Sequence, residues 1–312
     1  MQFSGSTTEA PSEDTVLLMT GGYNSGRLST EIYPAVSGCS PPALPEGRYG
    51  HSTFATTGAS PKLVTCGGYN EGWTASCLVM TKQGWSDSMI GQLPQPRAYH
   101  AAVSMENIGT YLIGGFSVNM RKTTDFLGEA STEWVAGPDI PVDMHQPCAV
   151  KISNQSFLII QNTDIREYEV DITDPTSDSG WQSATKWPQL QTSRYSQPGC
   201  SKIDNHIVIA GGWSSGQYLQ STEVLDLKTN SLMYAGELNS PRSNFHMATI
   251  TRDGQQLILA FGGETTGTTA LNSVEQFNPS NNTWTLAPTG MEEARSQFAA
   301  VVVPTTMVCP TT

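Results

Sequence analysis

Charged residues are few in this chain, and positive charge is the scarcer kind. Only 14% of the 312 residues are charged, with 16 Lys and Arg against 28 Asp and Glu, so the formal net charge is −12. Binding to nucleic acid or to an anionic membrane surface by counterion release requires a basic face. We therefore expect neither nucleic acid nor a membrane surface as a partner.

Long apolar runs are absent as well. No stretch of about 18 apolar residues occurs, which is the length that a membrane-spanning helix requires. Residues 1–14 (MQFSGSTTEAPSED) are too polar for the core of a signal peptide or for a membrane anchor. We expect a soluble chain without membrane insertion, from which any secretory leader has been removed or in which it never existed.

Motifs for metal, phosphate and covalent chemistry are also missing. The five histidines show no H-x-H or H-E-x-x-H spacing, and neither a C-x-x-C pair nor a glycine-rich phosphate loop occurs. Residues 212–216 (GWSSG) match the G-x-S-x-G nucleophile motif, but a strand pattern follows where that motif requires a helix. The sequence therefore predicts no metal, no cofactor and no serine nucleophile.

What the chain does contain is a repeat, marked by an apolar run that ends in two glycines. The copies are LLMTGG ending at Gly22, LVTCGG at Gly68, YLIGG at Gly115, IVIAGG at Gly212 and LILAFGG at Gly263. FLIIQN, which ends at Asn162, has the position of a sixth copy whose glycines are replaced. With it, the intervals between copies run from 46 to 51 residues. Six repeats of nearly equal length are therefore present.

Two further features recur in phase with the glycine pairs. An arginine precedes most of the apolar runs, and Met144 takes its place in the fourth copy; the arginines are Arg48, Arg97, Arg194, Arg242 and Arg295. A tryptophan followed by a turn closes several copies, at Trp85, Trp134, Trp181 and Trp284. Over residues 15–303 this pattern resembles the kelch family of β-propellers, in which a repeat of about 50 residues forms one blade.

The resemblance implies an all-β, six-bladed kelch-type propeller with four antiparallel strands in each blade. The chain begins inside a repeat, so the C-terminal strand is expected to pair with the N-terminal blade and close the ring. We expect a flexible segment at 1–14, one propeller domain at 15–303 and a C-terminal tail at 304–312, which Cys309 could tie down. The expected blades are 15–47 with 295–303, 48–96, 97–143, 144–193, 194–241 and 242–294.

Six cysteines alone allow 15 pairings. The repeat map favours three of these pairs, Cys39 with Cys309, Cys66 with Cys77, and Cys148 with Cys200, although buried free thiols are the alternative. The even count, the low charge and the glycosylation sequons at Asn154 and Asn281 favour a secreted, extracellular glycoprotein. Free thiols would instead favour the cytoplasm.

In kelch propellers the loops that join blades and those after the glycine pairs emerge on one face, around a central channel. Mapping by register places two residue sets on this loop face as ligand-binding candidates. They are the five arginines Arg48, Arg97, Arg194, Arg242 and Arg295, and the aromatic residues Tyr23, Tyr69, Phe116 and Trp213, with Trp73 further along one loop. The alternative is structural: the arginines bond loop carbonyls and the aromatic residues cap the blades. The fourth repeat has Met144 in place of the arginine and Gln161-Asn162 in place of the glycine pair. Either this divergent part of the face determines ligand specificity, or the change reflects only a loss of selection on a buried turn.

The resemblance favours a non-catalytic binding module for a protein segment or a glycan on the loop face. Kelch adaptor proteins use arginines at similar positions to contact acidic peptides, so a small anionic ligand is a further possibility. One alternative is an enzyme acting on a small anionic or sugar substrate in the channel mouth, with Glu264 or His100 as acid or base. Another is a structural protein of the extracellular matrix.

Overall fold

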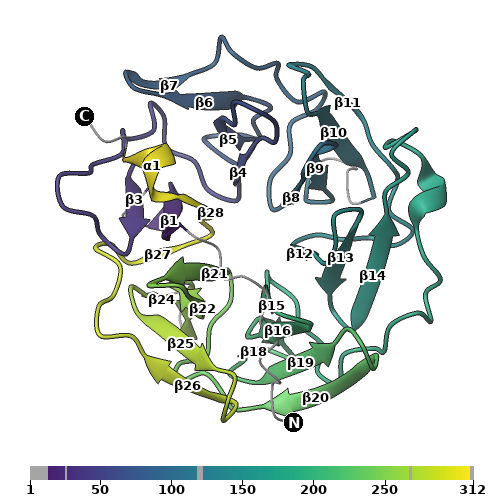
Figure 1. Cartoon of the computed structure of the whole chain (residues 1–312). Helices are drawn as coiled ribbons and strands as arrows, with labels where there is room; N and C mark the ends of the chain where they lie inside the picture. The colour runs from purple at the N-terminus through teal and green to yellow at the C-terminus, as the bar shows by residue number, and fades with distance from the viewer. Residues whose placement is uncertain (1–12, 25–26, 118–121, 267–268, 310–312) are drawn as a thin grey trace.

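The computed structural model describes residues 13–24, 27–117, 122–266 and 269–309 of the chain. Six antiparallel sheets radiate from a central channel, and the chain is a six-bladed β-propeller (Figure 1). One strand of each blade lies next to the channel. These innermost strands are, from blade one to blade six, β28 (Ala299–Pro304), β4 (Ser52–Ala55), β8 (Ala101–Met105), β12 (Cys148–Lys151), β15 (Gly199–Ile203) and β21 (His246–Arg252).

The second strand of each blade contains the apolar run that ends at a glycine pair. These strands are β1 (Thr15–Thr20), β5 (Leu63–Cys66), β9 (Gly109–Ile113), β13 (Ser156–Gln161), β16 (His206–Ala210) and β22 (Gln255–Phe261). In β9 and β13 every residue is buried, because each second strand has a strand on either side and a blade against either face. Every interface between neighbouring blades holds an apolar cluster, such as Leu158 and Ile160 of blade four against Ile207 and Ile209 of blade five.

The third strands are β3 (Thr30–Tyr33), β6 (Cys77–Thr81), β10 (Thr124–Gly128), β14 (Asp164–Glu169), β19 (Thr222–Asp226) and β25 (Val274–Asn278). Four blades have an outer strand, which is β7 (Gly84–Ser86), β11 (Trp134–Ala136), β20 (Ser231–Ala235) or β26 (Thr283–Leu286). The remaining elements are the short loop strands β2 (Tyr23–Asn24), β17 (Trp213–Ser214), β18 (Gln217–Tyr218), β23 (Glu264–Thr265), β24 (Thr269–Ala270) and β27 (Arg295–Ser296), the 3-10 turn η1 (Asp178–Gly180) and the helical turn α1 (Thr305–Val308).

The expectation of four strands in every blade is wrong for blades one and four, whose sheets have three strands among the described residues. After β3, residues 34–47 contain four prolines, which lack the N–H group that a strand must donate. In blade four, residues 171–187 form turns and η1, and Trp181 keeps only a single bridge to Tyr168. The repeat register would put Cys39 at the start of the outer strand of blade one, but Cys39 directly follows a turn and donates its N–H to the Val36 carbonyl at 3.1 Å.

The ring closes as the sequence predicts, because β1 pairs antiparallel with β28, from Thr15 opposite Pro304 to Thr20 opposite Ala299. Three disulfides are present, and they are the three predicted pairs: Cys39–Cys309, Cys66–Cys77 and Cys148–Cys200. The first ties the turn after β3 to the end of α1, the second joins β5 to β6, and the third links two innermost strands. Among the described residues, none of the helices has the length and apolarity needed to span a membrane.

Candidate functional site

The five repeat arginines lie inside the blades and do not reach the loop face. Each side chain is fully buried, and its Nη1 donates to the carbonyl of the first glycine of its own blade, as Arg97 does to Gly114 at 3.1 Å and Arg194 to Gly211 at 2.8 Å. The structural alternative therefore holds for these residues. Their assignment as ligand-binding residues is corrected for Arg48, Arg97, Arg194, Arg242 and Arg295.

A carboxylate neutralises each of these buried charges. In four blades it comes from the third strand, and the pairs are Arg97–Asp125 at 2.8 Å, Arg194–Glu223 at 3.0 Å, Arg242–Glu275 at 2.5 Å and Arg295–Glu31 at 2.9 Å. In blade two Leu78 takes the third-strand position, and Glu46 pairs with Arg48 instead. Sequence reasoning missed these acids, although they recur 9 to 12 residues after the glycine pairs.

The glycine pairs turn the second strand at the loop face and join neighbouring blades. Gly67 has φ +67°, and a Cβ there would lie 2.5 Å from the carbonyl oxygen of Arg97, so only glycine fits. Its neighbour Gly68 donates its N–H to that same oxygen at 2.8 Å. In the altered fourth repeat Asn162 keeps a positive φ of 57° and bonds the Arg194 carbonyl at 2.7 Å. The substitution thus preserves the bond to the next blade, while Gln161 pairs directly with Asp164 and shortens the loop.

Aromatic side chains form a continuous surface on the loop face over blades one to three. We call the residues Tyr23, Tyr49, Tyr69, Trp73 and Phe116 the aromatic arc. Their ring centroids follow one another at 5.3 Å, 5.5 Å, 5.2 Å and 5.1 Å. Phe116 is 36% exposed, and the other four are partly exposed. A surface of this kind offers flat apolar area with polar tips, which is typical of recognition sites.

Both ends of the arc have further partners. The guanidinium of Arg27 lies 5.5 Å from the ring centroid of Tyr23 and 5.6 Å from that of Tyr49, in cation–π contact. At the other end His145 stacks on Phe116 with 6.1 Å between centroids. The structure thus brings Tyr23, Tyr69 and Phe116, three of the four predicted aromatic residues that directly follow a glycine pair, into one arc with the predicted Trp73.

Trp213, the fourth predicted aromatic residue, lies apart in blade five. It is 37% exposed and pairs through the backbone with Tyr195, which is 43% exposed. Tyr49 and Tyr195 were missed by the sequence analysis, yet a signal was there, since each directly follows a repeat arginine.

Polar side chains cross the channel at its loop-face end. Tyr99 donates its hydroxyl to Gln297 Oε1 at 3.0 Å, and Gln146 donates to Asn244 Oδ1 at 3.1 Å. We call these four residues the mouth network. Backbone bonds tie it to the blades, for example from Gly50 N to the Gln297 carbonyl at 2.8 Å and from Gln297 N to the Asn244 carbonyl at 2.9 Å.

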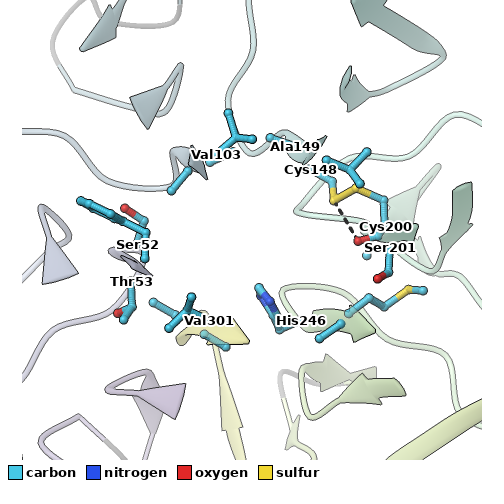
Figure 2. Close-up of a pocket in the computed structure, with 18 of the residues that line it drawn as sticks. Ser52, Thr53, Val103, Cys148, Ala149, Cys200, Ser201, His246 and Val301 are labelled. Atoms are coloured by element: carbon cyan, nitrogen blue, oxygen red, sulfur yellow. Dashed lines mark hydrogen bonds between the residues drawn. A yellow bond between two sulfur atoms is a disulfide. The ribbon is translucent and has the colours of Figure 1, made fainter. Parts of the chain in front are cut away.

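Below the mouth network the channel encloses a cavity of about 630 Å3. All six innermost strands contribute to its wall, and Figure 2 labels a residue from each of them, including Ser52, Val103, Ala149 and His246. The Cys148–Cys200 disulfide lies in this wall. The lining combines small apolar side chains with hydroxyl groups, three histidines and two lysines.

The two residues considered for acid–base chemistry are held by separate partners. Glu264 accepts hydrogen bonds from Asn244 at 2.8 Å and Ser296 at 3.3 Å on the loop face. His100 Nε2 is 2.8 Å from Ser52 Oγ within the channel wall. Burial, with a smaller effect of the Arg97 charge, lowers the pKa of His100 to about 3. A catalytic role for either residue stays a prediction.

The buried histidines predict that the fold weakens in mild acid. Burial lowers the pKa of His100 to about 3 and that of His246 to about 4, from an ordinary value of 6.5. Between those values the unfolded chain binds more protons, so stability is complete above about pH 6.5 and is lost as the pH falls toward the folded-state pKa values. From pH 7 to pH 5 we expect the two residues together to remove about 4 kcal/mol of unfolding free energy.

Urea unfolding at both pH values checks this expectation. His51 is buried as well, and burial also lowers its pKa. A His246→Gln variant should therefore lose less of the histidine-linked stability on acidification, because one of three such groups is gone. An equal loss in the variant and the parent protein would contradict the assignment.

Comparison with known families agrees with this architecture. A sequence profile of the kelch motif matches residues 194–231 and 254–291, which fall in blades five and six. The chain is therefore a kelch-type six-bladed β-propeller. Kelch propellers generally act as protein-interaction modules. No curated protein matches the chain.

Proposed function

We propose that this protein is a non-catalytic binding module that holds a protein segment on the aromatic arc of its loop face. The observation that carries the proposal is the run of contacting, partly exposed rings from Tyr23 to Phe116. Rigid aromatic side chains supply much contact area at a small entropic cost, which is why they dominate binding hot spots. The mouth network and the buried ion pairs hold the loops that present these rings.

The charges on the loop face limit the kind of protein segment that can bind to the aromatic arc. The repeat arginines are buried and paired, so they offer no donors to an acidic peptide or to a small anion on this face. Glu71 is exposed on the same loops, in a chain of net charge −12. The exposed Glu46 is paired with Arg48, and Arg27 lies against Tyr23 and Tyr49 at one end of the arc. A segment with apolar and basic side chains therefore fits best, because electrostatic complementarity favours it at long range and aromatic faces attract cations at contact.

The proposal includes an oxidising, extracellular setting. Three disulfides are rare in a cytosolic protein and common in a secreted one. Asn154 and Asn281 are exposed in turns, and both turns lie at the strand ends opposite the glycine pairs. Glycans at these predicted sites would leave the loop face free.

The test selects peptides from a displayed library for binding to the parent protein. The affinities of the selected peptides are then measured for the parent protein and for variants of the arc. Trp73→Ala is expected to weaken the selected peptides about 30-fold, and Tyr69→Ala by a similar factor, as for hot-spot residues. Tyr234→Ala is the matched control, because Tyr234 is 52% exposed on β20 at the rim, and it should leave affinity unchanged.

Two results would refute a peptide-binding role for the arc. One is full affinity in both arc variants. The other is selective binding of glycans from an array, lost in Trp73→Ala, with no peptide selected; that outcome would assign the arc to sugar rings.

A further inference from the structure

The end of the channel opposite the loop face carries an unusual pair of lysines. Lys151 and Lys202 lie at equivalent positions near the ends of β12 and β15, and both line the cavity. Lys202 Nζ reaches across to blade four and donates to the carbonyl of Ile152, the residue after Lys151, at 3.1 Å. The charge of Lys151 acts on Lys202, and both ammonium groups belong to the same end of the channel.

This arrangement costs free energy, since like charges repel. Burial and the charge of Lys151 both lower the pKa of Lys202, while the charge of Asp204 raises it. The carboxylate nearest Lys151 belongs to Glu106, at 3.7 Å, and that side chain is 71% exposed, so it is a weak counter-ion. In a chain with 28 acidic and 16 basic residues, two lysines at one end of a cavity suit an anion that binds beside them.

The Cys148–Cys200 disulfide fixes the two strands that carry the lysines. Cys148 lies three residues before Lys151, and Cys200 lies two residues before Lys202. A covalent link between the innermost strands of blades four and five fixes the spacing of the two strands from which the lysines project. Such preorganisation reduces the entropic cost of binding a ligand between them.

The rest of the cavity suits an organic body rather than a bare ion. Val103, Ala149 and Val301 present apolar side chains to the channel (Figure 2). His246 lies about three residues, or about 10 Å, nearer the loop face than the lysines, and its ring faces the channel in Figure 2. Burial lowers the pKa of His246 to about 4, so the imidazole is neutral at pH 7. It can then donate a hydrogen bond to a polar group of the ligand or accept one from it.

Side chains cross the channel at one end of the cavity. The mouth network's hydrogen bonds lie one residue above His100, Pro147 and Phe298 of the lining, while Gln197 of blade five lines the cavity at the level of the network. We expect a ligand to enter at the lysine end, which these hydrogen bonds do not cross. A volume of about 630 Å3 lies within the range of sites for small molecules, which are mostly apolar with a few polar groups.

We propose that the channel is a second binding site, separate from the aromatic arc, for a small organic carboxylate. Its carboxylate pairs with Lys151 and Lys202, its apolar body packs on Val103, Ala149 and Val301, and the far end approaches His246. A single negative charge fits better than a polyanion, because the protein as a whole repels anions.

Calorimetric titration with 3-phenylpropionate tests the site. We expect saturable binding to the parent protein, at least tenfold weaker binding of the uncharged analogue 3-phenylpropanol, and no comparable binding of inorganic phosphate. The double variant Lys151→Met with Lys202→Met should weaken 3-phenylpropionate at least tenfold. Lys228→Met, which changes an exposed lysine on an outer turn, and Trp73→Ala on the aromatic arc should not change it.

A second variant, Val301→Trp, fills the cavity without touching a charge and should abolish binding. Thermal unfolding shows whether each variant is folded, and the lysine variant decides alone if Val301→Trp is not. The proposal is overturned by absence of saturable binding to the parent, by equal affinity for the acid and the alcohol, by phosphate binding as tight as that of the acid, or by unchanged affinity in the folded lysine variant.

Discussion

Replacing Cys39 and Cys309 with alanine is expected to lower the free energy of unfolding by about 5 kcal/mol, the upper end of the range for single disulfides. The two cysteines are separated by 270 residues, so in the unfolded chain their bond removes the entropy of a very long loop. The bond also anchors the β28–β1 pairing that closes the ring. Equilibrium urea unfolding measures the loss.

Amide hydrogen exchange shows which strands lose stability when the Cys39–Cys309 disulfide is removed. In the Cys39/Cys309 variant, exchange should rise first in β28 and α1, because these elements lose their link to the turn after β3. The variant Cys66→Ala with Cys77→Ala is the control, since its disulfide spans only 11 residues within blade two and its effect should stay in that blade. Unchanged stability, or exchange that rises first outside blade one, would contradict this account of ring closure.

Replacing Arg242 with methionine should cost about 3 to 5 kcal/mol of stability, because it leaves a charge buried without its partner. Glu275 is completely buried and pairs with Arg242 at 2.5 Å. It also accepts hydrogen bonds from Asn239 and Ser240 in the loop before blade six. The loss of the arginine therefore disturbs the connection between two blades as well as the glycine turn.

A double-mutant cycle tests the pairing. Arg242→Met combined with Glu275→Gln should cost less than the sum of the two single changes, since the second change removes the unpaired charge. The result that would contradict a structural role is a folded Arg242→Met variant of parental stability that has lost affinity for a loop-face ligand. That result would return the arginine to the ligand-binding residues.

The repeat determined how much of the fold could be predicted. Six in-phase copies predicted six blades, and an incomplete first copy predicted the pairing of β1 with β28. The same register brought the two cysteines of each favoured pair to the same region, and all three pairs are present, although Cys39 does not lie on the outer strand that the register assigned to it. The missing outer strands were not predicted, although the prolines after Tyr33 were visible, because the repeat argument assumed equal blades.

The candidate site was harder to predict, because register gives the position of a residue and not the direction of its side chain. Arg97 lies at the loop-face end of its blade as expected, but Asp125 and the Gly114 carbonyl draw its guanidinium inward. The aromatic arc depends on contacts between blades, such as Tyr49 against Tyr69 and Trp73 against Phe116. The approach of Lys151 and Lys202 depends likewise on how blades four and five pack.

Hydroxyl-radical footprinting of the protein with a selected peptide bound tests most directly the claim that recognition takes place on the aromatic arc. Oxidation of Tyr69, Trp73 and Phe116 should fall on binding, while that of Tyr234 and Leu286, which are 52% and 61% exposed at the rim, should stay at the unbound rate. Protection of the rim residues, with the arc oxidised as in the free protein, would contradict recognition on the loop face.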